Sequence, residues 1–234
     1  NKSQGLDEAE QLYEDGFDSE YEHRTILLSD AQPNRGTTDE NSFRSTLESR
    51  AAKGLHTSVV GIGVDFNAEL IDEITAVRGA NYYSVHSAEQ FSQRMVEGFE
   101  YMVTPLVYDL ALELDAEGYD IDHVYGSTAA EEATGELLSV NTLFPSRSQD
   151  GKAEGGVVLV KLDRTETDST GELELQASWE RRDGTTESTT AQITIDQAPH
   201  WGNSGIRKAV LLARHADVLT HWTVSERDIP TEAV

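Results

Sequence analysis

The feature that most constrains the fold is a change in hydrophobic periodicity at Thr104-Pro105. Before this point, short apolar runs alternate with segments whose apolar residues recur every three or four positions. After it, apolar and polar residues alternate one by one, as in residues 106–115. The first pattern is typical of buried strands between helices, and the second of strands with one face in water. We therefore expect an α/β segment over residues 1–104, followed by an all-β segment.

The α/β segment contains three apolar runs that read as buried strands, at residues 24–30, 56–63 and 81–85. Helical stripes precede, separate and follow these runs, and residues 87–90 (Ser-Ala-Glu-Gln) form a capping box that begins the last helix. Strands that alternate with helices form parallel sheets covered on both faces. The sequence therefore predicts a partial Rossmann-like sheet, and three strands make it thin for its class.

The all-β segment, residues 105–196, holds six candidate strands separated by turn signals. Asp183-Gly184 is a hairpin turn between the last two strands. Short strands with regular turn signals are typical of an antiparallel β-sandwich. The remaining residues, 197–234, predict a C-terminal helix that is capped by Ser204 and packed on a domain.

The charge of the chain excludes several classes of partner. Acidic residues outnumber basic ones 43 to 18, for a formal net charge of −25. Nucleic acids and anionic membrane surfaces are bound through clustered Lys and Arg, so we expect neither as a partner. No segment approaches the ~20 apolar residues of a membrane-spanning helix. The absence of cysteine excludes disulfides, cysteine zinc sites and thiol catalysis.

Polar residues follow each predicted strand of the α/β segment. Asp30 ends the first strand, Asp65 follows the second, and His86 follows the third. Open parallel sheets bind their ligands at the carboxyl ends of the strands, where these residues are expected to lie. Two roles for Asp30 are left open by its position, a solvent-facing loop residue and an oxygen ligand for a hard divalent cation.

Motifs for catalysis are missing, and we predict no enzymatic activity. The seven histidines do not fall at zinc-ligand spacing. Gly61-Ile-Gly63 lacks the third glycine of a dinucleotide-binding loop, and Ser29-Asp30 is not part of a Gly-x-Ser-x-Gly elbow. A hydrolase of the haloacid type needs a second Asp two residues after the first, where this chain has Gln32.

Several of these segments together resemble the C-terminal part of a von Willebrand factor type A (VWA) domain. The similarity is to the bacterial branch in which a β-sandwich follows the A domain, and a bacterial or archaeal source is expected. It covers about residues 1–104, and less specifically the sandwich and final helix. The segments that carry it are Arg24-Thr-Ile-Leu-Leu-Ser-Asp30, the Pro33-Asn34-x-Gly36 loop, residues 56–67 and Gly79-Ala-Asn-Tyr-Tyr83.

The resemblance implies a metal-ion-dependent adhesion site for Mg²⁺ or Mn²⁺. In that family the ion is held by an Asp-x-Ser-x-Ser after the first strand, a Thr from a later loop, and an Asp at the end of the fourth strand. Asp30 matches the last of these. A protein partner binds over the ion, and the resemblance implies that the surrounding rim is formed by Asn34, Arg35, Asp65 and Asn67. Asn67 has a rival role as the cap of the following helix.

The chain departs from the family pattern at the other metal ligands. It contains no Asp-x-Ser-x-Ser, and Ala31 stands where the family usually has Gly. Asn1 corresponds to the position just after the missing Thr, so the chain resembles an A domain that lacks its first three strands. One carboxylate cannot hold Mg²⁺ by protein ligands alone. We therefore expect either that the missing motif lies upstream in a longer product or that the chain carries no ion.

The sequence predicts a non-enzymatic protein-binding module, acting in adhesion or as a scaffold. The alternative is a metal-free structural or interaction protein whose β-sandwich is the working part. The resemblance favours a location outside the cytoplasm, but the residues themselves do not identify the compartment, the partner or the oligomeric state.

Overall fold

A computed structural model describes residues 2–14, 16, 18, 20–29, 40–63, 68–149, 152–153, 155–165, 172–195 and 204–226. The fold is mixed α/β, with a parallel three-stranded sheet, separate antiparallel sheets and a C-terminal helix, which confirms the predicted fold class. The chain divides into two compact units. The first comprises residues 1–111, 140–154 and 178–188, and the second comprises 112–139, 155–177 and 189–234. The domain boundaries predicted from the sequence, 1–104, 105–196 and 197–234, stay predictions.

The first unit contains the predicted alternation of helices and strands. Its elements along the chain are α1 (Lys2–Glu14), β1 (His23–Ser29), α2 (Glu40–Ala51), β2 (Leu55–Ile62), α3 (Ala68–Thr75), β3 (Asn81–Val85), α4 (Ala88–Ser92), the π-helical turn η1 (Gln93–Glu97) and α5 (Phe99–Val103).

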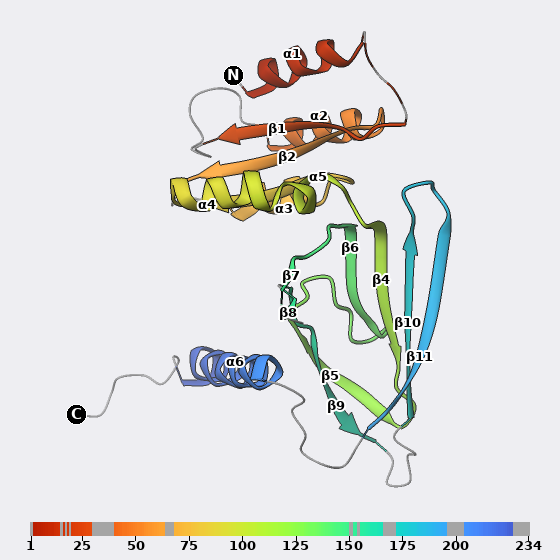
Figure 1. Ribbon diagram of the computed structural model, residues 1–234. Helices are drawn as coiled ribbons and strands as arrows, with labels where there is room; N and C mark the ends of the chain where they lie inside the picture. The colour runs from red at the N-terminus through yellow and green to blue at the C-terminus, as the bar shows by residue number, and fades with distance from the viewer. Residues whose placement is uncertain are drawn as a thin grey trace, which may run out of the picture. The chain divides into compact units, whose positions relative to one another are not determined.

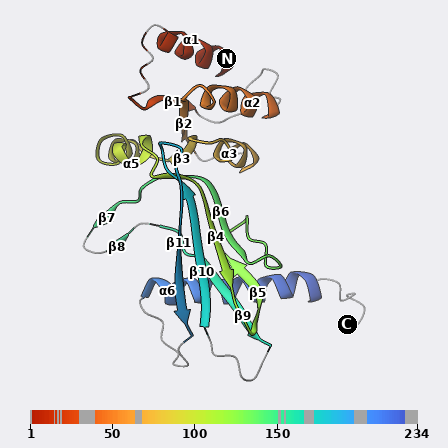
Figure 2. The same ribbon diagram turned by 90° about the vertical axis from the view of Figure 1, so that its right-hand side faces the viewer.

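The parallel sheet has the order β1-β2-β3. Successive side chains of a strand point to opposite faces, so Val59 and Val60 enter different cores. Figure 2 shows α2 and α3 on one side of the sheet and α5 on the other. The first core consists of Leu6, Leu47, Val59, Ile74, Val77 and Ala80, and the second of Val60, Val85 and Met102. Tyr82 and Tyr83 pack against the first and the second core respectively.

A buried arginine ties α1 to the sheet. The Arg50 side chain is only 2% exposed, and its Nη1 donates to the backbone oxygen of Leu6 at 2.5 Å. The same atom lies 3.2 Å from Oε2 of Glu10, whose other carboxylate oxygen accepts from Lys53 at 2.5 Å. That bond to Lys53 is the main reason why the pKa of Glu10 is lowered. A guanidinium this deeply buried requires such partners, because leaving it unpaired would be costly.

The helix predicted after the third strand is divided into three short pieces. The capping residue is as expected, since the Ser87 side chain accepts from the Gln90 backbone N–H at 3.1 Å. The α-helix ends after one turn, however, and η1 follows it as far as Gly98, where α5 begins. A Cβ atom at Gly98 would lie 3.0 Å from the backbone oxygen of Arg94. Turns of π-helix are rare and change the direction of the side chains that they carry.

The remaining strands form antiparallel sheets. The larger sheet has the order β11-β10-β4-β6 (Thr186–Thr194, Glu172–Glu180, Val107–Asp115 and Glu136–Leu143), and the division between the two units falls within these strands. A second sheet pairs β5 (Tyr119–Tyr125) with β9 (Leu159–Arg164), which lie side by side in Figure 1. The short strands β7 (Ser148–Gln149) and β8 (Lys152–Ala153) pair with each other.

The second unit has its own hydrophobic core, which joins side chains of the two sheets. Leu114 of β4, Val124 of β5, Leu137 of β6 and Leu173 of β10 are its buried residues. The core around Leu114 and Leu173 packs one sheet against the other, as the alternating pattern of the sequence predicts.

The predicted hairpin between β10 and β11 is present, because the Arg181 backbone N–H donates to the oxygen of Thr185 at 2.8 Å. Gly184 in this turn has φ +84°, a conformation that favours glycine.

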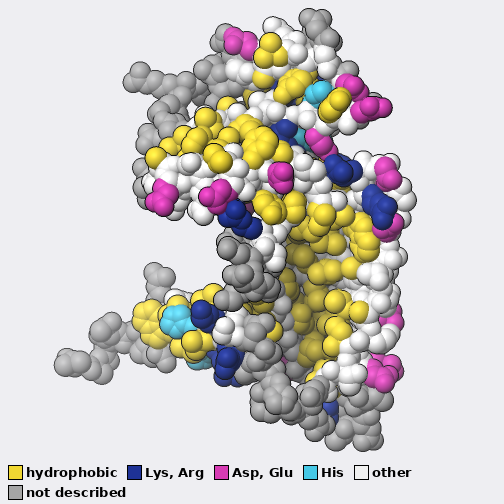
Figure 3. Space-filling model, viewed as in Figure 1, with side chains coloured by type: hydrophobic (Ala, Val, Ile, Leu, Met, Phe, Trp, Pro, Cys, Tyr) yellow, Lys and Arg dark blue, Asp and Glu magenta, His cyan; other side chains and the backbone are white. Residues whose placement is uncertain are grey.

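The C-terminal helix α6 (Ser204–His221) is followed by a π-helical turn, η2 (Trp222–Glu226). The Tyr125 hydroxyl of β5 donates to the Asp217 carboxylate of α6 at 2.9 Å. Figure 3 shows hydrophobic side chains on the surface of α6. Leu211 is 69% exposed and Trp222 is 56% exposed. Within the described residues, every helix is too short or too polar to cross a bilayer.

Candidate functional site

The parallel sheet brings the carboxyl ends of its three strands to one edge. Ser29, the last residue of β1, pairs with Gly61, and Ile62 at the end of β2 pairs with Val85 at the end of β3. The last residues of β1, β2 and β3 therefore lie next to one another. This is the edge at which open parallel sheets bind their ligands.

Apart from His86, the residues predicted for this edge lie outside the described residues. They are the proposed metal ligand Asp30 and the proposed rim residues Asn34, Arg35, Asp65 and Asn67. Among the residues that the structure describes, no three His, Cys, Asp or Glu side chains come together where they could hold a metal ion. The side chains described at this edge include the Ser84 hydroxyl and the His86 imidazole, which lie 3.1 Å apart and do not fit the oxygen-rich coordination of Mg²⁺. The ion therefore stays a proposal that depends on Asp30.

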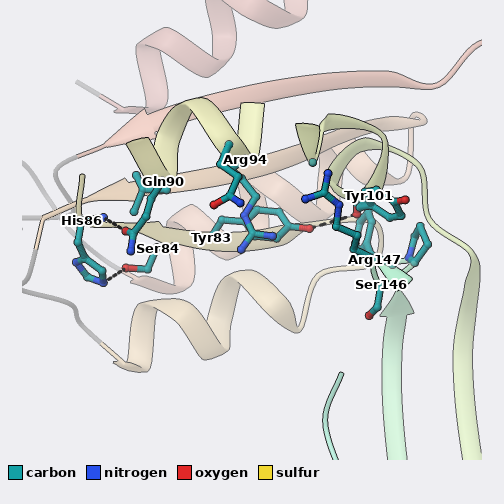
Figure 4. Close-up of a pocket in the computed structure, with 13 residues that line it drawn as sticks. Tyr83, Ser84, His86, Gln90, Arg94, Tyr101, Ser146 and Arg147 are labelled. Atoms are coloured by element: carbon teal, nitrogen blue, oxygen red, sulfur yellow. Dashed lines mark hydrogen bonds between the residues drawn. The ribbon is translucent and has the colours of Figure 1, made fainter. Parts of the chain in front are cut away.

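A cavity of about 520 Å³ opens beside the end of β3. Its wall is formed by β3, by the helical pieces α4, η1 and α5, and by residues 144–147, which follow β6. Figure 4 shows His86, Ser84 and Gln90 at one end, Arg94 and Tyr83 in the middle, and Tyr101, Ser146 and Arg147 at the other end. Every described residue of the wall belongs to the first unit.

Tyr83 and Arg94 form a stacked pair in the middle of the cavity. The Arg94 guanidinium lies 4.9 Å from the centre of the Tyr83 ring, within the range of a cation–π interaction. The ring is held in place because its hydroxyl accepts from Asn81 Nδ2 at 3.2 Å and donates to the Tyr101 oxygen at 3.4 Å. Burial raises the pKa of Tyr83, so this hydroxyl is protonated at neutral pH. Arg94 comes from the π-helical turn η1, and the Tyr83 ring that it contacts comes from strand β3.

The two ends of the cavity carry different polar groups. At one end, Arg147 pairs with the Glu97 carboxylate at 3.1 Å. At the other, His86 Nε2 lies 3.1 Å from the Ser84 hydroxyl, and the His86 backbone N–H donates to Gln90 Oε1 at 2.8 Å. In a standard capping box, that Gln side chain bonds the N–H of the cap residue itself. Here it bonds the preceding residue and so fixes the backbone at the end of β3.

A second polar cluster is formed around Arg24, at the amino end of the sheet. Arg24 Nε donates to the Val103 oxygen at 2.8 Å. Arg24 Nη1 donates to the Ser58 hydroxyl at 3.0 Å and to the Gly79 oxygen at 2.8 Å. Gly79 in turn contacts His56, since a Cβ atom placed on it would lie 1.9 Å from His56 Nδ1. Arg24, His56, Ser58 and Gly79 are not among the described residues that line the cavity, so we assign this cluster a structural role.

The His56 imidazole should make stability fall more steeply as the medium becomes acidic. Burial lowers its pKa, the charges of Arg24 and Arg78 lower it further, and Glu22 and a backbone hydrogen bond oppose them. The unfolded chain therefore takes up a proton below about pH 6.5 that the folded chain resists, so this contribution is present above that pH and is lost below it. We expect the Tm difference between about pH 7.5 and pH 5.5 to shrink in His56→Gln.

The matched control for this experiment is His86→Gln, which removes an exposed imidazole from the opposite end of the sheet. Both variants respond to the general loss of negative charge at low pH, so only the difference between them reports on His56. An equal pH dependence in the two variants would contradict the assignment.

The chain is similar to known proteins in structure, and no similarity in sequence was found. No protein-family model matches the sequence, and no curated protein matches it significantly. Two solved structures are similar at the level of the fold. The von Willebrand factor type A protein from Catenulispora acidiphila has 16% identity and a TM-score of 0.40, covering 82% of this chain and 46% of that one. The ArnB paralog VWA2 from Sulfolobus acidocaldarius has 20% identity and a TM-score of 0.31, covering 81% and 45%.

The chain spans less than half the length of either structure. Of the residues that line the cavity, only His86 is predicted from the sequence to follow a strand at the binding edge. Arg94 and Arg147 are separated by more than fifty positions, and no local pattern connects them.

Proposed function

We propose that the chain is a non-enzymatic, protein-binding module of the VWA type. It binds its partner at the carboxyl edge of the parallel sheet, through the loops that follow β1 and β2. The observation that carries the proposal is the strand register, which places the end of β1 beside the end of β2 and the end of β2 beside the end of β3. The sequence motifs that resemble the VWA family lie in and directly after these strands.

We also propose that partner binding uses a divalent ion. Asp30 directly follows Ser29, and its carboxylate is proposed as one ligand of Mg²⁺ or Mn²⁺. The ion can be held only if an Asp-x-Ser-x-Ser motif exists upstream and supplies the other ligands. Asn34, Arg35, Asp65 and Asn67 are proposed as the rim that contacts the partner, and the partner would complete the coordination with an acidic group.

Metal binding can be tested by thermal unfolding, with and without Mg²⁺ or Mn²⁺, of a longer product that includes an upstream Asp-x-Ser-x-Ser segment, because Asp30 alone cannot hold the ion. An ion that binds only the folded state stabilises it by about 2.7 kcal/mol at a concentration of 100 Kd. For a chain of this size, that corresponds to a rise in Tm of about 5–11 °C. We expect Asp30→Ala to abolish the rise and Asp183→Ala, in the hairpin turn, to retain it. If Asp30→Ala keeps the full rise, the ion binds elsewhere and the assignment of Asp30 is wrong.

The absence of any rise in the unsubstituted protein would argue against ion binding and favour the alternative, a metal-free structural or interaction protein that uses the β-sandwich. The apolar side chains exposed on α6 are the observation that supports this second candidate. Such residues are usual where a helix contacts another molecule.

A further inference from the structure

The cavity beside β3 differs in charge from the rest of the chain. Acidic residues outnumber basic ones 43 to 18 overall. The described residues that line the cavity nevertheless include Arg94, Arg147 and His86, and none of them is Asp or Glu. A concave site with a cationic wall on an anionic protein concentrates small anions locally while the protein as a whole repels them.

Arg94 is the group best placed to bind an anion. Among the described residues it forms no ion pair, whereas Arg147 is already paired with Glu97. The Arg94 guanidinium lies over the Tyr83 ring in the wall of the cavity, and its N–H groups can donate to an anion bound there. A guanidinium edge donates two parallel hydrogen bonds to a carboxylate, which is among the strongest polar contacts in proteins.

The size and the remaining wall of the cavity indicate the class of ligand. A volume of about 520 Å³ lies within the usual range for small-molecule sites, which is roughly 300–1,000 Å³. Half-buried Tyr101, Phe144 and Pro145 line the end near Arg147, and an aromatic ring can pack against them. The chain charge of −25 disfavours ligands with several negative charges more than those with one.

We propose that this cavity binds a monocarboxylate that bears an aromatic group, with the carboxylate on Arg94 and the ring against Tyr101 and Phe144. Such a group is found both in free aromatic acids and at the C-terminus of a peptide that ends in an aromatic residue. The proposal does not depend on the ion or on the carboxyl edge of the sheet, because no described residue of the cavity is a proposed metal ligand.

The test is an NMR titration of the protein, in the presence of EDTA, with two pairs of probes. One pair is benzoate and benzamide, and the other is the acetylated peptide Ala-Ala-Phe with a free C-terminus and with an amidated one. We expect each carboxylate to shift the amide signals of residues 83–101 and 144–147, and each amide to bind at least ~10-fold more weakly. Which of the two carboxylates binds more tightly identifies the source of the ligand.

Arg94→Gln should weaken carboxylate binding at least ~10-fold and leave Tm nearly unchanged, because the side chain is exposed. The matched control is Arg164→Gln, which also removes an exposed arginine stacked on a tyrosine, at 5.5 Å from the Tyr119 ring. Equal weakening in both variants would reduce the effect to net charge and overturn the proposal. Absence of binding by either carboxylate at millimolar concentration, or tighter binding of inorganic phosphate, would also overturn it.

Discussion

Replacing Arg24 with alanine should lower the free energy of unfolding by about 3 kcal/mol. The substitution removes three hydrogen bonds, to the Val103 oxygen, the Ser58 hydroxyl and the Gly79 oxygen. Two of these acceptors are backbone carbonyls, and each would lose a charged donor in a part-buried environment. Removing one partner of a buried pair costs more than the bond contributes, because the group that remains is desolvated without compensation.

The side chain of Arg24 also contributes packing. Its guanidinium lies 5.3 Å from the centre of the Phe144 ring, which adds a cation–π contact within the first unit. Burial lowers the pKa of Arg24, which is the expected sign of a cation that has been withdrawn from water. Its partners compensate for the lost hydration at Nε and Nη1, while the buried Nη2 has no hydrogen-bond partner among the described residues.

Thermal and urea unfolding of Arg24→Ala would measure this loss, with an expected fall in Tm of about 6–12 °C for a chain of this size. The matched control is Arg44→Ala, which breaks ion pairs to Glu48 and Glu73 on the surface. Exposed pairs contribute little, so the control should unfold close to the unsubstituted protein. If the two variants lose the same stability, the Arg24 hydrogen bonds do not hold the sheet and the helix together as we infer.

Most of the first unit could be predicted from the sequence because its signals are local. The apolar runs at 24–30, 56–63 and 81–85 correspond to β1, β2 and β3 within a residue at each end. The hairpin at Asp183-Gly184 was predicted from two residues for the same reason. Runs and turns of this kind depend on neighbouring residues alone, so a single sequence contains the information.

The interactions of Arg24 could not be predicted in this way. In the sequence it is only the polar residue that begins an apolar strand. Its acceptors, at Val103, Ser58 and Gly79, are 79, 34 and 55 residues away along the chain. The cavity could not be predicted for the same reason, because Arg94 and Arg147 come from parts of the chain that are far apart in the sequence. The π-helical turn after Ser92 was also missed, because the apolar stripe of residues 91–102 fits a regular helix equally well.

Replacing Gly79 with alanine should cost about 2–5 kcal/mol of stability, from two separate causes. Gly79 has φ +75°, in the left-handed region, where an L-residue with a Cβ atom is strained by roughly 1–2 kcal/mol. The added Cβ would also lie 1.9 Å from Nδ1 and 2.4 Å from Cε1 of His56, so the buried ring has to move. Forcing an extra methyl group into a packed site typically costs about 1–3 kcal/mol.

The two causes can be separated with a control and a double variant. Gly184 has φ +84° and no atom within 4 Å of its Cβ position, so Gly184→Ala should show the strain alone. The excess loss in Gly79→Ala then measures the clash with His56. Removing the ring in His56→Ala should relieve that clash, so the double variant should be more stable than the sum of the two single losses predicts. Additive losses would mean that the ring does not restrict Gly79, and that the Cβ atom is accommodated by a movement of the turn from Val77 to Ala80.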